Sequence, residues 1–471
     1  MTQLYLIIFT INILPRAIFI YFFPETGGDY EIYTTVAKNI VNGCGVSLSD
    51  PTLTDCVPHF GGNHGPGYPL FISLIWSIFN FSDDMVRYVQ AIIYGISCVW
   101  LSYSLFQFSG EKKSILIVGI MVALSPLLIA WPRYVQTETL ALASSIWVLA
   151  EILLSISKNK IRIITVALSL ILATWLRLDN ILLTVPVAVT VLYIHGLRKG
   201  LINGLIIFLI LSSTWFTWTV RNIHLGVDLI PTSMVMQDGS RPPTGYIAWL
   251  KTWVTHEYER PGALWTINRK NYDTVYIPEY AYKNNEEKII VNNLLLELKG
   301  FTGEPFPEYI DNNFKKLASK IMTNNIWEYW FLNTFTRSYR LWTNPFSSFG
   351  WPNEMPDKDL SKTERLQIAE GNIGVMISKI INNPYQALSK AFIAIYRVIL
   401  ILLMLYYIII FLRSRSKIKM GILLIVLSYL VSRTLFFSIH SANFETRYLL
   451  TTMPFIEIFV LLAFFNLFKN E

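Results

Sequence analysis

The sequence predicts an all-α polytopic membrane protein with about ten transmembrane helices. Hydrophobic residues make up 53% of the 471 residues, charged residues only 15%, and the mean hydropathy is +0.43. Several apolar runs approach the roughly 17 to 25 residues that cross the hydrocarbon core as a helix. Because no water satisfies the backbone there, these runs must be helical. The predicted spans are 4–23, 86–108, 115–131, 139–156, 161–177, 180–195, 201–220, 388–412, 420–437 and 449–468.

The turns between the spans are of two alternating kinds. Four are basic and lie at 112–113, 158–162, 198–199 and 413–419. Four others combine acids with bases or aromatic residues and lie at 28–30, 133–138, 177–179 and 445–448. Cytoplasmic turns carry an excess of Lys and Arg. We therefore expect both chain ends inside the cell and the mixed turns outside, and we read the net charge of +7 as a topology signal rather than a nucleic-acid site.

Three parts are expected along the chain. Residues 1–220 form a membrane core that includes a first outer loop, 24–85. The apolar segment 69–81 in this loop has about 13 residues, too few to cross the bilayer unaided. It is expected to be an in-plane or re-entrant helix on the outer face. Residues 221–387 form an α-rich extracytoplasmic insertion, and 388–471 supply the last transmembrane helices.

The three cysteines contain no CxxC pair and indicate no metal site. Cys44 and Cys56 lie in the same outer loop, so they either form a disulfide in an oxidising compartment or remain two thiols. Cys98 is expected to pack inside a span. His59 and His64 could bind a metal, but an isolated pair of histidines is more often part of hydrogen-bonded structure.

Asp29 is the candidate residue of the first outer loop. The spacing of Asp29, Tyr33 and Ala37 places them on one face of a helix. The acid stands at the start of that helix, directly after two glycines. Such an acid has a structural explanation, because it can cap free N–H groups and interact favourably with the helix dipole.

Further motifs follow in a fixed order. They are Gly28-Asp29-Tyr30, a helix with Tyr33, Ala37 and Gly43, the turn Pro66-Gly67-Tyr68-Pro69, Glu138, the pair Arg177 and Asp179, and Arg447-Tyr448 followed by Pro454. This order resembles the GT-C superfamily of integral-membrane glycosyltransferases, in particular bacterial polyprenyl-phosphate-sugar-dependent enzymes related to protein O-mannosyltransferases and the lipid A aminoarabinose transferase. The resemblance covers 1–220 and 388–471, whereas the insertion carries no recognised motif.

The resemblance implies a GT-C fold and an inverting glycosyltransferase in the bacterial inner membrane, with its site facing the periplasm or the cell exterior. The donor would be a polyprenyl-phosphate-linked sugar. The acceptor would be a hydroxyl of lipid A, of an O-antigen or other glycan, or of a protein. Two alternatives are an O-antigen ligase or polymerase that uses diphosphate-linked donors and a lipid-sugar flippase or transporter. Such transporters usually carry broken helices near the membrane midplane and repeated halves.

The expected chemistry assigns roles to the mixed turns. Asp29 would take the proton from the acceptor hydroxyl, with Glu138 as a second acid that binds the acceptor or orients Arg133. Arg177 and Arg447 would clamp the donor phosphate, because a guanidinium pairs bidentately with phosphate oxygens. Alternatively, each arginine pairs with a neighbouring acid, Asp179 or Glu445, and only anchors a helix end.

Two further residues are assigned to the donor phosphate, Tyr448 and His64. Family members often carry Arg or Lys before the proline turn, where this chain has His64. A lone Glu138 also replaces the paired acids of metal-dependent relatives, so a divalent metal is possible but not required. Arg16, inside the first span, is expected to snorkel or to form a structural pair, with contact to the donor phosphate as the alternative.

Overall fold

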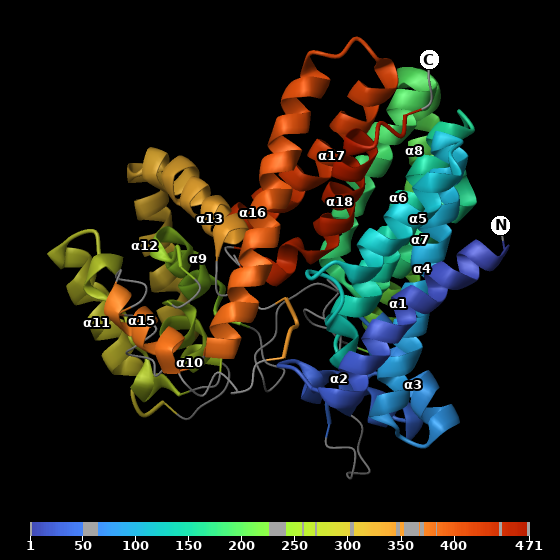
Figure 1. The fold of residues 1–471 in the computed structure, drawn as a ribbon. Coiled ribbons are helices and arrows are strands. Elements are labelled where there is room, and N and C mark those ends of the chain that lie inside the picture. The colour runs from blue at the N-terminus through green and yellow to red at the C-terminus, as the bar shows by residue number, and fades with distance from the viewer. Residues whose placement is uncertain are drawn as a thin grey trace.

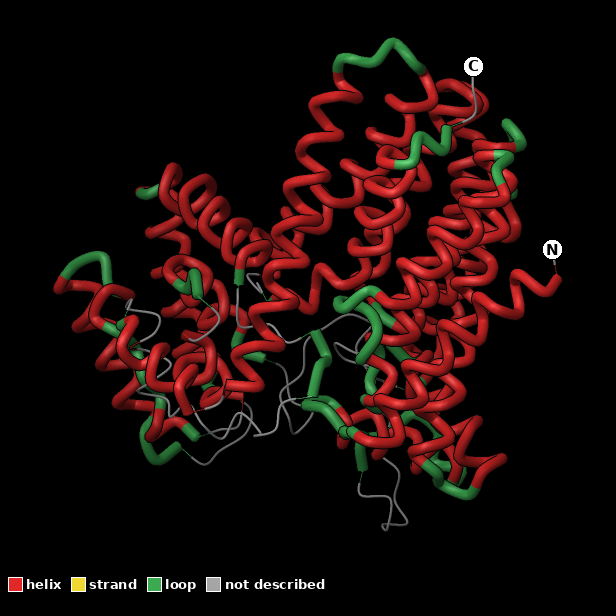
Figure 2. Tube along the Cα trace, viewed as in Figure 1, coloured by secondary structure: helices red, strands yellow, loops and turns green. Residues whose placement is uncertain are grey.

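All the long elements of the protein are helices. The computed structural model describes residues 2–49, 65–225, 242–256, 259–268, 271–301, 306–344, 349–352, 367, 372–382, 384–441 and 445–468. Within these ranges the only extended pairing is a single bridge between Glu25 and Tyr134. Figures 1 and 2 show a bundle of long helices with a second helical lobe beside its lower half.

The bundle contains helices at the positions of the predicted spans. They are α1 (Thr2–Phe22), α4 (Asp83–Ser109), α5 (Lys112–Leu124), α6 (Glu138–Ser157), α7 (Ile163–Leu176), α8 (Thr184–His224) preceded by η2 (Leu178–Leu183), α16 (Pro384–Leu412), α17 (Lys417–Leu435) and α18 (Met453–Phe464) preceded by η9 (Thr446–Thr452). Seven runs of the described residues are long and apolar enough to cross a membrane. The protein is therefore a polytopic membrane protein, as predicted. α5 and α7 are shorter, with 13 and 14 residues.

The long helix α8 reverses direction at Gly196. This residue has φ +67°, in the left-handed region that favours glycine. A Cβ placed on Gly200 would lie 3.4 Å from Leu192 Cα, whereas eight residues of straight helix span about 12 Å. The run is thus a hairpin of two helices, which matches the separate spans predicted at 180–195 and 201–220.

Two shorter helices lie at the lower end of the bundle in Figure 1. These are α2 (Tyr30–Val41) and α3 (Gly67–Phe79), the latter close to the predicted segment 69–81. The turn into α3 needs glycine, because a Cβ on Gly67 would lie 2.7 Å from Trp175 O. The buried rings of Tyr33 and Tyr68 meet edge to face, 5.0 Å apart, and join the two helices.

The insertion forms the second lobe. Its main helices are α9 (Thr244–Trp253), α11 (Asn285–Leu298), α12 (Glu308–Asn324), α13 (Asn333–Thr343) and α15 (Ile373–Asn382), with short turns at η4 (Pro261–Trp265), α10 (Thr266–Asn268), η5 (Tyr272–Thr274), η6 (Glu279–Ala281) and η7 (Glu328–Leu332). The fully buried Trp249 contacts Tyr246 and Phe314. The lobe is therefore α-rich, as predicted, and has packed aromatic side chains of its own.

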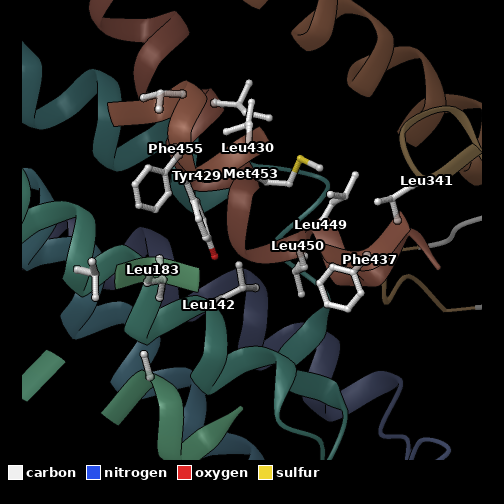
Figure 3. Packing of buried hydrophobic residues seen from close by; sticks show 14 of the residues in the cluster. Leu142, Leu183, Leu341, Tyr429, Leu430, Phe437, Leu449, Leu450, Met453 and Phe455 are labelled. Atoms are coloured by element: carbon white, nitrogen blue, oxygen red, sulfur yellow. The ribbon is translucent and has the colours of Figure 1, made fainter. Parts of the chain in front are cut away.

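An apolar cluster in the bundle supports the segment that precedes α18. Figure 3 shows Leu449 and Leu450 of η9 packed among buried side chains of α6, α17 and α18. The hydroxyls of Tyr429 and Thr451 lie 2.8 Å apart. These contacts fix η9, so the two polar residues that precede Leu449 have a defined position.

Two predictions from the sequence are resolved within the described residues. Cys44 forms a disulfide, Cys98 is a free buried thiol, and Cys56 lies outside the described residues. Arg16 is fully buried and donates to Asn12 O at 2.8 Å and Ala123 O at 3.0 Å. Its guanidinium also lies 4.0 Å from the ring centre of Tyr94. Arg16 is thus held within the bundle, and snorkelling is wrong.

Candidate active site

Four of the predicted site residues meet at one place, although they come from separate parts of the chain. Asp29 precedes α2, Glu138 begins α6, Arg177 follows α7, and Arg447 lies in η9. Arg447 Nη1 lies 3.9 Å from both Asp29 Oδ2 and Glu138 Oε1. Arg177 Nη1 lies 2.9 Å from the same Glu138 oxygen. The mixed turns therefore converge on one charged cluster.

Asp29 does not cap its helix. It occupies the N-cap position of α2, but its side chain forms no capping hydrogen bond. Its side chain is 34% exposed, and its Oδ2 lies 3.9 Å from Arg447 Nη1. The capping explanation is therefore wrong, and the carboxylate is open to a ligand. Next to it, burial together with the charges of Asp29 and Glu138 raises the pKa of the Tyr33 hydroxyl well above its usual value, so this phenol stays protonated.

Glu138 and Arg177 are locked together. Glu138 is 3% exposed, and its ion pair with Arg177 is a charge-assisted hydrogen bond. Arg177 Nε also binds Asp179 Oδ1 at 3.1 Å. Burial alone would lower the pKa of Arg177, but Asp179 and Glu138 outweigh burial and raise it. The predicted pairing with Asp179 is thus present, and Arg177 has a second carboxylate as well.

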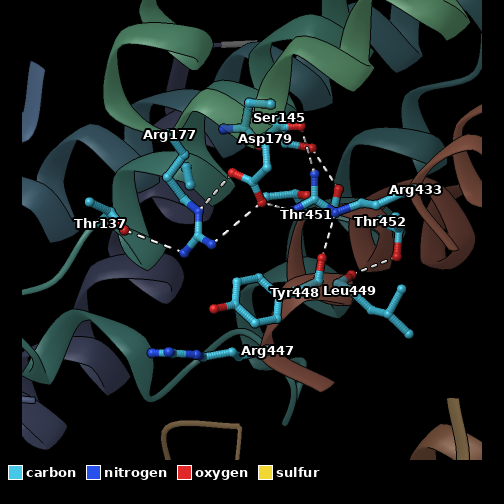
Figure 4. Close-up of polar contacts among 12 residues, drawn as sticks. Thr137, Ser145, Arg177, Asp179, Arg433, Arg447, Tyr448, Leu449, Thr451 and Thr452 are labelled. Carbon is cyan, nitrogen blue, oxygen red and sulfur yellow. Dashed lines mark hydrogen bonds and ion pairs between the residues drawn. The ribbon is translucent and has the colours of Figure 1, made fainter. Parts of the chain in front are cut away.

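Arg433 is a member of the cluster that the sequence analysis missed. It lies near the end of α17, is 1% exposed, and its Nη2 lies 2.6 Å from Asp179 Oδ2. Its Nε donates to the backbone carbonyl of Tyr448, as Figure 4 shows. Arg433 thus connects η2 to η9. The sequence does place this arginine inside the predicted span 420–437. Because an intramembrane charge needs a partner, that position could have pointed to a buried ion pair.

Arg447 is less restrained than Arg177. Its Nε forms an ion pair of 2.6 Å with Glu445 Oε2. The side chain is 30% exposed. The ring of Tyr448 lies between the two arginines, 5.5 Å from the Arg177 guanidinium and 5.3 Å from that of Arg447. Arg447 is therefore the arginine of the cluster with donors available to a ligand.

A second missed residue comes from the insertion. Arg260 Nη1 lies 3.0 Å from Glu445 Oε1. Burial would raise the pKa of Glu445, but Arg447 and Arg260 together hold it below its usual value. Glu445 therefore stays ionised between two arginines. No sequence motif pointed to Arg260, because it lies 185 residues from its partner.

Other predicted residues are not part of the cluster. Arg133 donates to the carbonyls of Gly350 and Phe23, so the expectation that Glu138 orients it is wrong. His64 and His59 lie outside the described residues. Within the residues that the structure describes, no three His, Cys, Asp or Glu side chains are grouped as a metal site would require.

Comparisons with known proteins address the membrane core. Residues 63–218 match the model of a family described as dolichyl-phosphate-mannose-protein mannosyltransferase. A crystal structure of ArnT from Cupriavidus metallidurans bound to undecaprenyl phosphate is similar at 10% identity, covering 98% of this chain and 76% of that chain. Its TM-score of 0.35 is too low for the likeness to support a conclusion. No curated protein matches the chain. The family match covers about a third of the chain and supports the resemblance of residues 63–218 to the GT-C superfamily of membrane glycosyltransferases.

Proposed function

We propose that the protein is an inverting glycosyltransferase that moves a sugar from a polyprenyl-phosphate donor to a hydroxyl of a cell-envelope acceptor on the extracytoplasmic face. The family match to residues 63–218 supports the class of enzyme. One observation carries the assignment of roles. Asp29 and Arg447 face each other at 3.9 Å and are each about one-third exposed, so a base and a cation are open to substrates side by side.

The reaction follows from this pair. Asp29 accepts the proton of the acceptor hydroxyl, whose oxygen forms a bond to the anomeric carbon of the sugar. The bond between that carbon and the phosphate oxygen breaks, and its electron pair leaves with the polyprenyl phosphate. Arg447 neutralises the charge that develops on the phosphate. Attack from the face opposite the leaving group inverts the anomeric carbon.

The remaining charges have supporting roles. Arg177 is held by Glu138 and Asp179, so its guanidinium is pre-organised and cannot rotate freely towards a ligand. Tyr448 packs between Arg177 and Arg447 and keeps the two guanidinium groups apart. Glu138 is buried and paired, which makes it a poor base compared with Asp29.

A donor assay with purified protein in proteoliposomes tests the proposal. Polyprenyl-phosphate sugars and their diphosphate-linked counterparts are supplied with extracted envelope glycolipids, and release of the lipid phosphate is measured. We expect consumption of monophosphate donors and a product of inverted anomeric configuration by NMR. Consumption of diphosphate donors alone would favour the ligase or polymerase alternative. Movement of the lipid-linked sugar across the bilayer without covalent transfer would favour a flippase.

A further inference from the structure

We propose that the insertion is a working part of the donor site, because Arg260 positions Arg447 through Glu445. This inference rests on the proposed function. Arg260 reaches the site through Glu445, so it is a positioning residue rather than a catalytic one.

The carboxylate of Glu445 bridges the two lobes. One oxygen, Oε1, lies 3.0 Å from Arg260 Nη1, and the other, Oε2, lies 2.6 Å from Arg447 Nε. The side chains of Arg260 and Glu445 are 13% and 15% exposed. Water therefore screens this bridge poorly, and loss of either cation would leave a largely buried carboxylate less compensated.

Arg260 is carried on a fixed backbone. The preceding residue, Glu259, is 5% exposed. It accepts hydrogen bonds from the backbone N–H groups of Thr255 and His256 at 2.7 and 2.8 Å. Its other oxygen accepts from Tyr280 Oη at 2.9 Å. A closed loop thus holds the segment in place, so the position of the Arg260 side chain is set by the fold of the insertion.

The same segment is fastened to the membrane core next to the site. Arg337 of α13 is 1% exposed and donates to Val254 O at 2.9 Å and Ser438 O at 3.2 Å. Ser338 and Ser438 share a hydrogen bond of 2.9 Å. Ser438 lies in η8 (Phe436–Ser441), between Arg433 and the Glu445 turn. Arg337 and Ser338 therefore attach the insertion to η8, which precedes the Glu445 turn along the chain.

This arrangement predicts that loss of Arg260 impairs use of the donor selectively. Without Arg260, Glu445 would interact more strongly with Arg447 and draw its guanidinium away from Asp29. Affinity for the phosphate of the donor should fall, whereas use of the acceptor should not. A merely structural role for Arg260 would lower stability without separating the two substrates.

Binding of a sugar-free polyprenyl phosphate tests the inference independently of turnover. We expect Arg260→Met to weaken binding about tenfold and to raise the donor KM with little change in the acceptor KM. Arg260→Lys should recover part of the loss, because it keeps the charge but not the planar fork. The double variant with Glu445→Gln should bind no worse than Glu445→Gln alone, since both act through one contact.

Lys288→Met is the matched control, because it removes an exposed ion pair with Glu279 elsewhere in the insertion. It should bind as the wild type does, and thermal unfolding of all variants checks that they are folded. Wild-type affinity in Arg260→Met, or additive losses in the double variant, would overturn the role of Arg260. A wild-type protein that binds no polyprenyl phosphate would overturn the proposed function, and this inference with it.

Discussion

Arg447 Nη1 lies 3.9 Å from Asp29 Oδ2, a separation that allows charge attraction but no hydrogen bond. Arg177 and Glu138, in the same cluster, are hydrogen-bonded at 2.9 Å. The first pair can admit a ligand atom without breaking a hydrogen bond, whereas the second pair cannot. This difference separates the residues that should act on substrate from those that hold the site together.

Asp29→Asn should lower transfer by about 10² or more, the lower end for loss of a general base. Since Asp29 makes no capping hydrogen bond, the amide should leave α2 intact. Initial rates in proteoliposomes, together with the thermal unfolding midpoint, measure the two effects. Asp29→Glu serves as the charge-keeping control. Full activity in Asp29→Asn would remove the base assignment and make Glu31 or Glu138 the next residue to test.

Arg447→Ala should weaken donor use by about 1.5 to 3 kcal/mol, the value of a charge-assisted contact. It should lower stability only modestly, because Glu445 keeps its ion pair with Arg260. Arg177→Ala should also weaken donor use but lower stability more, because it removes a hydrogen-bonded cation from both Glu138 and Asp179. Donor KM and urea or heat unfolding in detergent distinguish the two. An unchanged donor KM in both variants would make these arginines structural.

Arg433→Met should destabilise the protein by about 3 to 5 kcal/mol, the range for breaking a buried pair from one side. Asp179 would keep Arg177, which places the expectation at the lower end. Combining the change with Asp179→Asn should restore part of the stability, because the uncompensated charge is gone. Unfolding of the double variant at or below the midpoint of Arg433→Met would show that Arg433 acts through other contacts.

The insertion should lose stability in mild acid. Burial, followed by the charge of Arg340, lowers the pKa of His256 to about 4, from an ordinary value of 6.5. Between these values the unfolded chain binds a proton that the folded chain does not, so stability falls as the pH drops from about 6.5 to about 4. His256→Asn should flatten this part of the profile. Thermal unfolding across pH 4 to 7 provides the measurement, and an equal slope in both proteins would contradict the assignment.

The mixed turns should face the cell exterior. Lys38 is exposed in the last turn of α2, and Lys113 is exposed in one of the basic turns. In intact cells an impermeant thiol reagent should modify Lys38→Cys and spare Lys113→Cys, whereas both should react after lysis. The reverse pattern in intact cells would mean that the topology is inverted.

Much of the membrane architecture could be predicted because apolar length and Lys or Arg turns act locally along the chain. The convergence of Asp29, Glu138 and Arg447 is in line with the prediction that the mixed turns lie on one side of the membrane. The partners of Glu445 and Asp179 could not be predicted in the same way, since Arg260 and Arg433 lie 185 and 254 residues away. Only packing of the insertion and of α17 brings such charges together. The capping role of Asp29 was open in the sequence, because an N-cap acid can turn its side chain away.

The reversal at Gly196 also determines on which side of the membrane the rest of the chain lies. If the run from Thr184 to His224 crossed the bilayer once, everything after it would exchange compartments, including Arg260, Glu445 and Arg447. Asp29 and Arg177 would stay where they are. Gly196 has a positive φ, bears no charge and makes no contact with the cluster. This residue nevertheless determines whether the two halves of the ionic site are assembled on the same side of the membrane.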